Sequence, residues 1–597
     1  MRGYRGFTVP LAGRTAGAGV TTSRRTDPPL HPGGTLMNRS SETQEPPTAS
    51  WPRSDLPYSI IAFILISIAV VRVISTYHTF NGTSDEPKHI AAGMEWLDKG
   101  TYTYEFLHPP LARVAMAVGP YLKGLRSHSL ANFIDEGNAI LYSDGDYWGN
   151  LSLARLGNLP FLVLASVVIL LWARRWFSRA AGLWALFLFL NLPPILGHAG
   201  LATLDVACAA TVIAALYQFM RWLETPAWRR AIGLGVGLAL AFLVKFSSLA
   251  FLATCCATAA IYFFLAKRDR AASYRHLRLR LGQACLTGCV TLVLLWAGYR
   301  FSMVPVSHSV GSHSRVDEWI SSTSVFHKAA YKFVETPLPL DQVLTGIAEV
   351  YAHTRLEGGG YLFGQYRDTG FWYFFPVVVA LKTPIGFLIL AAWGVVAMLR
   401  RWTRGPWQHC LTALFPVPIL LICMTSRINF GVRHILSIYP PLALAAGYAI
   451  SAAFRGRSRR SLAVVSVLLA GSVLADACLA HPDYMAWFNQ FAGRHPEKLL
   501  CESDLDWGQD LHRLSQRLNS LGVKQVSIGY FGTVPLEKAG LPEYHILSPD
   551  EKSIGYVAVS VRYTNLEYAE YGSYGWLRKY QPLERIGKSI DLYRIDR

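Results

Sequence analysis

Residues 58–86 read YSIIAFILISIAVVRVISTYHTFNGTSDE, a long apolar run that leads into two adjacent carboxylates. The run from 58 to 77 has the length of ~20 residues that a helix needs to cross the hydrocarbon core of a bilayer. Asp85 and Glu86 follow it after a short polar stretch. Charge near hydrocarbon is costly, so paired acids at the mouth of a membrane helix indicate a functional site at the water interface.

The composition agrees with a protein that crosses the membrane many times. Apolar residues make up 52% of the 597 positions and charged residues only 16%, which is too apolar for a soluble chain of this size. Runs of near-spanning length lie at 58–77, 156–172, 180–196, 201–220, 232–246, 249–266, 281–299, 374–399, 411–424, 434–454 and 462–480. We therefore predict a polytopic α-helical membrane protein with about eleven transmembrane helices.

Lysine and arginine cluster in alternate connections between these runs, which predicts that those connections are cytoplasmic. The clusters are Arg174–Arg179, Arg221–Arg230, Lys267–Arg280, Arg400–Arg404 and Arg455–Arg460. This bias accounts for much of the net charge of +18, so nucleic-acid binding is not needed to explain it. The intervening long segments should then face the extracytoplasmic side.

The chain divides into three expected parts. They are a disordered cytoplasmic tail at 1–55, a transmembrane domain at 56–480 with outer loops 79–149 and 300–369, and an extracytoplasmic α/β domain at 481–597. The tail has no long apolar core and is not read as a signal peptide, and Met37 offers an alternative translation start. In the last part, leucines at 511, 514 and 518 predict a helix, and runs 526–531 and 556–561 predict strands.

Two sets of outer acids are candidate catalytic groups. Asp85 precedes Pro87 in a helix-start pattern, so it is either a helix cap or a base for an acceptor hydroxyl. Glu86 beside it and His89 one turn later exceed what a cap requires. Asp205 stands at the outer entrance of the run at 201–220, where it is either a second functional acid or another cap.

Basic residues also gather on the expected outer side, against the general bias. Lys245, Lys382, Arg427 and Arg433 lie at or near the ends of apolar runs. Each would cost ~2.5 to 3.5 kcal/mol at the bilayer centre, so several of them together predict a phosphate bound at membrane depth. The alternative for any single cation, and our expectation for Lys245, is snorkelling to the lipid headgroups.

The segment 504–510, DLDWGQD, is dense in acids and contains Trp507, which can stack on a sugar. The alternative is that it caps and packs the helix that follows. His308 and His313 have no spacing typical of a metal site, so no metal is predicted and a divalent ion is not supported. Of nine cysteines, only Cys501 is clearly outside the apolar runs, so no disulfide framework is expected.

Several of these motifs, taken in order, resemble the GT-C membrane glycosyltransferases. They are Asp85-Glu86, Gly100, Pro109-Pro110-Leu111, Asp205, Lys382-Thr383-Pro384, Gly431-Val432-Arg433-His434 and Tyr439-Pro440. Within that group the chain is similar, over roughly residues 55–510, to protein O-mannosyltransferases and lipid A aminoarabinose transferases. Those families take sugar from a polyprenyl-phosphate carrier, so the resemblance implies a polyprenyl-phosphate-linked sugar as the donor.

The resemblance implies roles for the acids. Asp85 matches the catalytic acid of the first outer loop, Glu86 beside it positions the acceptor, and Asp205 matches the second outer acid. His89, Asp506 and Trp507 are the further candidates for contact with acceptor or sugar.

It also implies a site for the lipid phosphate. Lys382 and Arg433 match positions that face the phosphate, and Arg427 is a further candidate. His108 stands where the aminoarabinose transferases have a lysine before the paired prolines. An imidazole can still donate a hydrogen bond to phosphate.

We therefore predict an inverting glycosyltransferase that moves a mannose-like hexose or a pentose to an acceptor hydroxyl, with Asp85 as the base. The sequence has no Gly-rich nucleotide loop, so the donor should arrive from the bilayer. The expected partners are the bilayer, the lipid-linked donor and a protein or lipid acceptor, with the active site on the outer face of a bacterial inner membrane.

The main alternative, a transporter or flippase, should show repeated halves and charges near mid-bilayer. A non-catalytic scaffold does not explain the paired acids.

Overall fold

The computed structural model describes residues 56–266, 277–305, 317, 324–356, 358–400, 402–455, 460–565 and 574–596. The expected tail at 1–55 lies outside the described residues, and so do His308 and His313. The fold below is that of the compact unit that begins at Ser54.

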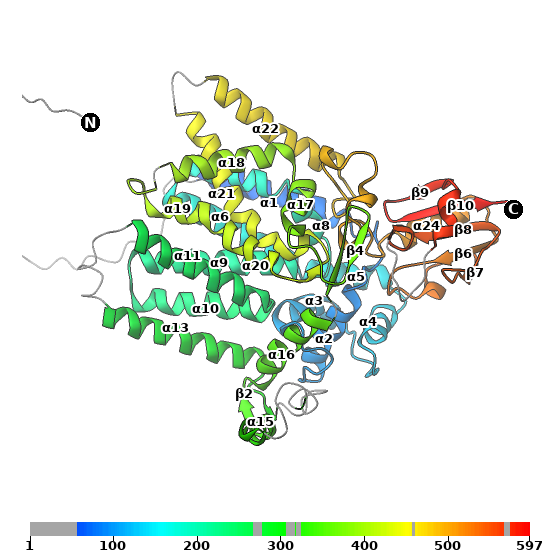
Figure 1. Cartoon of the computed structure of the whole chain (residues 1–597), viewed down its shortest axis with the longest axis horizontal. Helices are drawn as coiled ribbons and strands as arrows, with labels where there is room; N and C mark the ends of the chain where they lie inside the picture. The colour runs from blue at the N-terminus through cyan, green and yellow to red at the C-terminus, as the bar shows by residue number, and fades with distance from the viewer. Residues whose placement is uncertain are drawn as a thin grey trace, which may run out of the picture. The chain divides into compact units, whose positions relative to one another are not determined.

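Long apolar helices make up most of this unit (Figure 1). They are α1 (Leu56–Ile74), α6 (Leu159–Trp176), α7 (Arg179–Phe189), α8 (Pro193–Ala199), α9 (Asp205–Glu224), α10 (Trp228–Val244), α11 (Ser247–Ala266), α13 (Leu277–Gly298), α17 (Phe374–Lys382), α18 (Ile385–Leu399), α19 (Trp407–Leu414), α20 (Pro416–Met424), α21 (Tyr439–Ala453) and α22 (Arg460–Leu479). The 3₁₀ helix η3 (Val432–Ile438) leads directly into α21.

Among the described residues, 8 helical stretches are long and apolar enough to cross a membrane, or up to 10 if each bent pair is one span. This is fewer than the eleven expected, because two runs are broken and α10 has only 17 residues. The bends are 67° between α7 and α8 and 117° between α17 and α18. Prolines explain them, because Pro193 and Pro194 start α8 and Pro384 forces the preceding residue into an extended conformation.

Small residues let the central helices approach closely. α21 packs against both α7 and α18. A Cβ on Gly447 would lie 2.4 Å from the Ala181 carbonyl oxygen, and one on Gly394 would lie 2.0 Å from that of Ala445. Glycine is therefore required at both contacts, as is common where membrane helices pack tightly.

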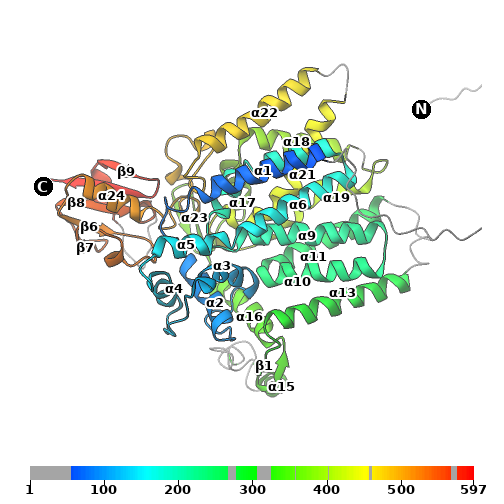
Figure 2. The ribbon, with the colours of Figure 1, turned by 180° about the vertical axis from the view of Figure 1, so that it is seen from behind.

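The segment predicted as the first outer loop forms a helical layer at one end of the membrane helices. It contains α2 (Glu86–Asp98), α3 (Pro110–Lys123) and α4 (Phe133–Tyr142), and α5 (Tyr147–Leu156) then begins the span that continues through α6. The segment predicted as the second outer loop contains β1 (Met303–Pro305), α15 (Val325–Glu335), β2 (Pro337–Pro339), α16 (Asp341–Leu356), β3 (Gly359–Leu362) and β4 (Gln365–Arg367). β5 (Ile428–Asn429) pairs with β3. Figures 1 and 2 both place α2 to α4 at the same end of the helices as the C-terminal sheet.

The C-terminal region is a small α/β domain. After the turns η4 (Gln490–Ala492) and η5 (Pro496–Lys498) and the short helix α23 (Glu502–Leu505), helix α24 (Leu511–Ser520) precedes a five-stranded sheet in the order β7-β6-β8-β10-β9. Its strands are β6 (Gln525–Gly529), β7 (Glu543–Ile546), β8 (Gly555–Ser560), β9 (Glu584–Ile586) and β10 (Ile590–Ile595).

Within this domain, leucines 511, 514 and 518 of α24 are buried against Val526 and Ile528 of β6, as their spacing predicted. The run predicted as a strand at 556–561 ends one residue early, because Val561 begins helix α25 (Val561–Asn565). The predicted class, a polytopic helical membrane protein with a C-terminal α/β domain, is confirmed.

Candidate active site

Asp85 lies at the start of α2 but does not act as its cap. Its side chain makes no capping hydrogen bond. Its two oxygens instead bind cations, with Arg433 Nη1 at 2.6 Å and Lys88 Nζ at 3.0 Å. The carboxylate is only partly exposed, so it is a shielded negative charge between two positive ones.

The charge state of Asp85 follows from this setting. Burial by itself raises the pKa of the carboxyl, but the positive charges of Lys88 and Arg433 outweigh burial and keep its pKa well below the usual value. Asp85 is therefore ionised at any physiological pH. A carboxylate paired in this way is a weak base until one of its cations is drawn away.

Arg433 is fixed by the backbone turn before it and by an aromatic ring. Gly431 has φ +132°, and a Cβ there would lie 2.8 Å from the hydroxyl oxygen of Ser503, so the turn requires glycine. The Arg433 guanidinium lies 4.3 Å from the ring centroid of Trp507. Its Nε is buried and has no hydrogen-bond partner among the described residues, so the group has a donor to spare.

A second ion pair joins Asp205 at the start of α9 to Lys245 at the end of α10, with Nζ 2.7 Å from Oδ1. Asp205 is 3% exposed. The sequence led us to expect that Lys245 snorkels to the lipid headgroups. The structure instead pairs it with Asp205. This lysine neutralises a buried acid that would otherwise be strongly unfavourable.

His108 lies beside His89, with its Nδ1 3.8 Å from Oε1 of Glu105. Its ring is 5.5 Å from that of His89, and its Nδ1 is buried without a hydrogen-bond partner among the described residues. Burial lowers its pKa to about 3, and the positive charges of Lys245 and Lys88 contribute. The imidazole is thus neutral at physiological pH, and it can offer a hydrogen bond but no charge.

His89 is positioned by Arg113, which is fully buried in α3. Arg113 Nε donates to Nδ1 of His89 at 3.2 Å, and its Nη1 donates to the Tyr102 hydroxyl at 3.0 Å. The same guanidinium forms an ion pair with Glu105. Because Nδ1 accepts this bond, His89 carries its proton on Nε2.

Glu86 belongs to a structural network and does not face the candidate site. It is fully buried, and Arg155 binds both of its oxygens, with Nε 2.8 Å from Oε1 and Nη2 2.9 Å from Oε2. The backbone N–H groups of Thr83 and Ala202 also donate to it at 2.8 Å. Both carboxylate oxygens of Glu86 therefore already accept hydrogen bonds within the protein. Neither oxygen is left to position an acceptor, which is the role that the sequence led us to expect.

Lys382 is likewise enclosed. It is 1% exposed, and its Nζ donates to the carbonyl oxygens of Met485 and Asp504, both at 2.7 Å. The ring of Phe488 lies 4.0 Å from the ammonium. Arg427 has an exposed side chain beside β5. Lys382 and Arg427 do not contact Asp85, whereas Arg433 does.

Asp506 organises the 504–510 segment from inside. It is fully buried and accepts backbone hydrogen bonds from Gly508 at 3.2 Å and Arg562 at 3.0 Å. Burial raises its pKa to about 7, although these hydrogen bonds lower it. This geometry favours the packing interpretation for Asp506. Trp507 is the member of the segment that touches the site, through the face that Arg433 covers.

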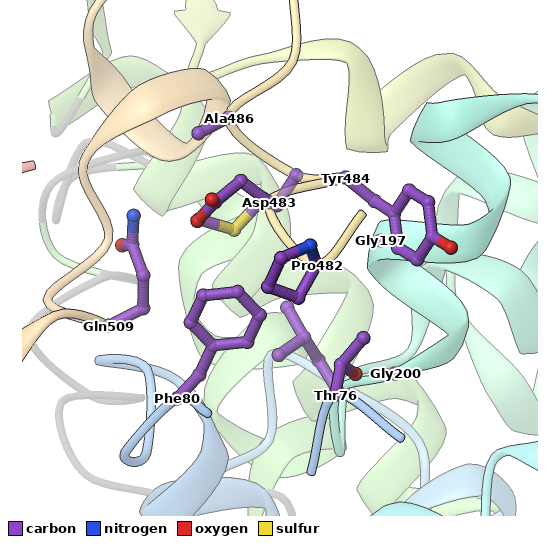
Figure 3. Close-up of a pocket in the computed structure, with 11 residues that line it drawn as sticks. Thr76, Phe80, Gly197, Gly200, Pro482, Asp483, Tyr484, Ala486 and Gln509 are labelled. Atoms are coloured by element: carbon purple, nitrogen blue, oxygen red, sulfur yellow. The ribbon is translucent and has the colours of Figure 1, made fainter. Parts of the chain in front are cut away.

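A small, mainly apolar pocket of ≈ 20 Å³ lies beside the segment 482–486 (Figure 3). Thr76, Phe80, Pro482 and Tyr484 lie around it, and none of the predicted site residues lines it. Leu201 and Met485 line the pocket and also pack against Trp507.

Sequence reasoning missed Lys88, Arg113 and Arg155, and it misjudged Lys245. The spacing of Asp85 and Lys88 was a usable signal, because residues three apart share a helix face. Arg155 gave no such signal, because its partner Glu86 is 69 positions away, and the partners of Arg113 lie 8 to 24 positions away in no regular helical spacing. As a whole, the described site contains a shielded carboxylate, a second acid and three cations on converging helix ends.

Residues 150–297 match the family described as dolichyl-phosphate-mannose-protein mannosyltransferase. No curated protein sequence matches the chain.

Among solved structures, ArnT from Cupriavidus metallidurans bound to undecaprenyl phosphate is 14% identical with a TM-score of 0.46, over 89% of this chain and 97% of that chain. AglB from Archaeoglobus fulgidus in complex with an inhibitory peptide and a dolichol-phosphate is 12% identical with a TM-score of 0.48, over 86% and 70%. The Pmt1-Pmt2 complex of S. cerevisiae bound to the sugar donor is 15% identical with a TM-score of 0.32, over 42% and 36%.

The family match covers the α5–α6 span, the bent α7–α8 pair, α9 with Asp205, and α10 with Lys245. It thus includes one of the two ion pairs of the candidate site. The resemblance expected from the sequence is confirmed, and with it the enzyme class: the chain is similar to the mannosyltransferase-like membrane glycosyltransferases that use polyprenyl-phosphate sugars.

Proposed function

We propose that this protein transfers a sugar from a polyprenyl-phosphate carrier to an acceptor hydroxyl on the extracytoplasmic side of the membrane, with inversion at the anomeric carbon and Asp85 as the base. The observation that carries the proposal is the contact of 2.6 Å between Asp85 and Arg433. It brings together a carboxylate and a cation that are 348 positions apart in the sequence.

The negative charge of Asp85 suits the acceptor hydroxyl, and the positive charge of Arg433 suits the leaving phosphate. The acceptor oxygen attacks the anomeric carbon while its proton passes to the Asp85 carboxylate. The bond from the anomeric carbon to the phosphate oxygen breaks, and its electron pair leaves with the polyprenyl phosphate. Arg433 stabilises the charge that develops on that oxygen.

Donor binding would also prepare the base. A phosphate that binds Arg433 competes with Asp85 for the guanidinium, and the loss of that partner raises the pKa of the carboxyl toward its usual range. The resting ion pair thus protects the site from an uncompensated buried charge until substrate arrives. The spare Nε donor of Arg433 is available for the same phosphate.

The remaining cations complete the phosphate site. Lys88 and Lys245 both lie close enough to His108 to lower its pKa. We assign Lys88, Lys245 and the neutral His108 to the surroundings of the phosphate, and Asp205 to the orientation of Lys245. Lys382, Glu86 and Asp506 are assigned structural roles because their polar atoms are already bonded. Arg427 is not included, since its side chain is exposed away from these contacts.

The proposal is tested with the full chain in liposomes. Polyprenyl-phosphate mannose, polyprenyl-phosphate aminopentose and the corresponding nucleotide sugars are supplied with radiolabel, together with membrane extract as the source of acceptor. We expect label to move only from a polyprenyl-phosphate donor. Transfer from a nucleotide sugar with no lipid-linked intermediate would overturn the proposal.

A further inference from the structure

A second cavity lies between helices α4, α5 and α24, and its lining residues Asn81 and Leu511 are close in the sequence to Phe80 and Gln509, which line the pocket of Figure 3. It has a volume of ≈ 360 Å³ and lies beside α4 and α5, which both views place next to the α/β domain. We call it the Trp148 groove. Ligand pockets for small molecules and short oligomers have volumes of roughly 300 to 1,000 Å³.

One wall of the groove is aromatic. Tyr142 and Tyr147 stack with ring centroids 4.4 Å apart, and Trp148 lies edge-on to Tyr147 at 5.3 Å. Aromatic residues at the end of a membrane span are common as interfacial anchors, and this alone could explain Trp148. Tyr142 precedes the span, however, and burial raises the pKa of its phenol to about 12, so it remains a neutral hydrogen-bond donor.

The wall formed by α24 carries uncharged hydrogen-bonding groups. The His512 ring packs edge-on against Trp148 with centroids 4.6 Å apart and is hydrogen-bonded to Gln516 at 2.9 Å, and Asn519 Nδ2 donates to the Gly540 carbonyl at 3.1 Å. His512, Gln516 and Asn519 all line the groove, and Gln516 and Asn519 are exposed. An anchor in the bilayer needs no such wall of amides. Lys538 is the one charged residue among those that line the groove, and Glu537 is next to it in the sequence.

The groove adjoins the loop that carries Asp85. Asn81 lines it and donates to the carbonyl of Gly508 at 2.7 Å, while its own side-chain oxygen accepts from the backbone N–H of His512 at 3.2 Å. Thr533, next to the lining residue Val534, contacts the carbonyl of Ser84 at 3.4 Å. A ligand in the groove would therefore lie beside the short segment between Asn81 and Asp85.

We infer that the Trp148 groove binds an uncharged saccharide and, on the assumption that the proposed function is correct, that this saccharide is part of the acceptor. Aromatic faces match the C–H faces of sugar rings, and amide and imidazole groups match hydroxyls that both donate and accept hydrogen bonds. A phosphorylated ligand fits less well, because the groove has a single cation.

The test measures binding without donor, so that it does not depend on catalysis. Mannotetraose, maltotetraose and chitotetraose are titrated into the full-length protein in detergent, with a Ser/Thr-rich peptide as the competing class of ligand. The variant Gln516→Ala/Asn519→Ala changes two exposed amides and should fold normally. The matched control is Gln525→Ala/Gln581→Ala, two exposed amides of the same domain that do not line the groove.

We expect at least one tetrasaccharide to bind, its dissociation constant to rise about tenfold in the groove variant through loss of two neutral hydrogen bonds, and the control to be unchanged. Binding of the peptide alone, binding of no tetrasaccharide at millimolar concentration, or equal affinities in both variants would overturn the inference. If sugar transfer occurs but no tetrasaccharide binds, the groove inference fails and the proposed function stands. If a tetrasaccharide binds but no polyprenyl-phosphate donor is used, the proposed function fails and the groove still binds saccharide.

Discussion

Asp85 shares its carboxylate between Arg433 and Lys88, so its role is best tested by a change that removes charge and keeps shape. We expect Asp85→Asn to lower the transfer rate by on the order of 10² to 10⁴, the usual contribution of a general base. Donor binding should persist or tighten, because Arg433 is released for the phosphate. Transfer of radiolabelled sugar and donor affinity are measured together.

The matched control for this variant is Asp98→Asn at the other end of α2, where the carboxylate contacts exposed Arg126 at 3.5 Å. It should leave transfer unchanged. An Asp85→Asn variant that transfers sugar at the unmodified rate would remove Asp85 from the mechanism.

Arg433 and Lys382 were equivalent candidates for the phosphate, and the structure now separates them. Arg433→Gln should weaken donor binding by ~1.5 to 3 kcal/mol, the contribution of a hydrogen bond to a charged group. Lys382→Gln should instead lower thermal stability, because it leaves the carbonyls of Met485 and Asp504 short of a donor. Donor affinity and melting temperature are measured for both variants, with Arg427→Gln as the exposed control. The assignment fails if Lys382→Gln binds donor as poorly as Arg433→Gln while melting normally.

At the scale of elements, the Arg155–Glu86 pair fastens the start of α2 to the α5–α6 span. Arg155 also donates to the carbonyls of Tyr77 and Asn81. Removal of one partner of a buried pair typically costs ~3 to 5 kcal/mol, so Arg155→Gln should be severely destabilised. The control Arg517→Gln breaks an exposed pair with Glu584, for which ~1 kcal/mol or less is expected. Similar melting temperatures for the two variants would contradict the structural role.

The loop at 504–510 should give the fold a pH dependence. The pKa of Asp506 is about 7 in the folded protein against 3.8 for the free group. The folded state therefore binds this proton more tightly than the unfolded state does. Its contribution to stability is fully present below pH 3.8 and is lost as pH rises through 7.

We expect the melting temperature of the protein to fall over this range. Asp506→Asn should flatten the fall, because the amide cannot ionise, whereas exposed Asp550→Asn should not. Melting curves recorded across the range check this, and an unchanged slope in Asp506→Asn would show that other groups dominate.

At the scale of the whole molecule, the expected orientation can be tested with introduced cysteines. The native Cys501 is a poor probe because it is buried. Asn519→Cys in α24 and Arg404→Cys between α18 and α19 are both exposed. In intact cells an impermeant thiol reagent should label the first directly and the second only after permeabilisation. The opposite pattern would place Asp85 on the cytoplasmic side, where nucleotide sugars are available.

The sequence by itself determined the membrane class, the apolar runs and the α/β domain, because helix length in a bilayer and strand alternation are local properties of the chain. It also singled out Asp85, Asp205, Arg433 and Trp507, since charges and aromatics at helix ends are conspicuous.

Only the tertiary structure decided which charges meet. Asp85 and Arg433 are 348 positions apart, and Asp205 and Lys245 are 40 apart, so no spacing rule could pair them. The same holds for Glu86 and Lys382, whose assigned roles changed once Arg155 and two backbone carbonyls were found around them. Proximity between distant residues depends on how helices pack, and packing is not a local property of the sequence.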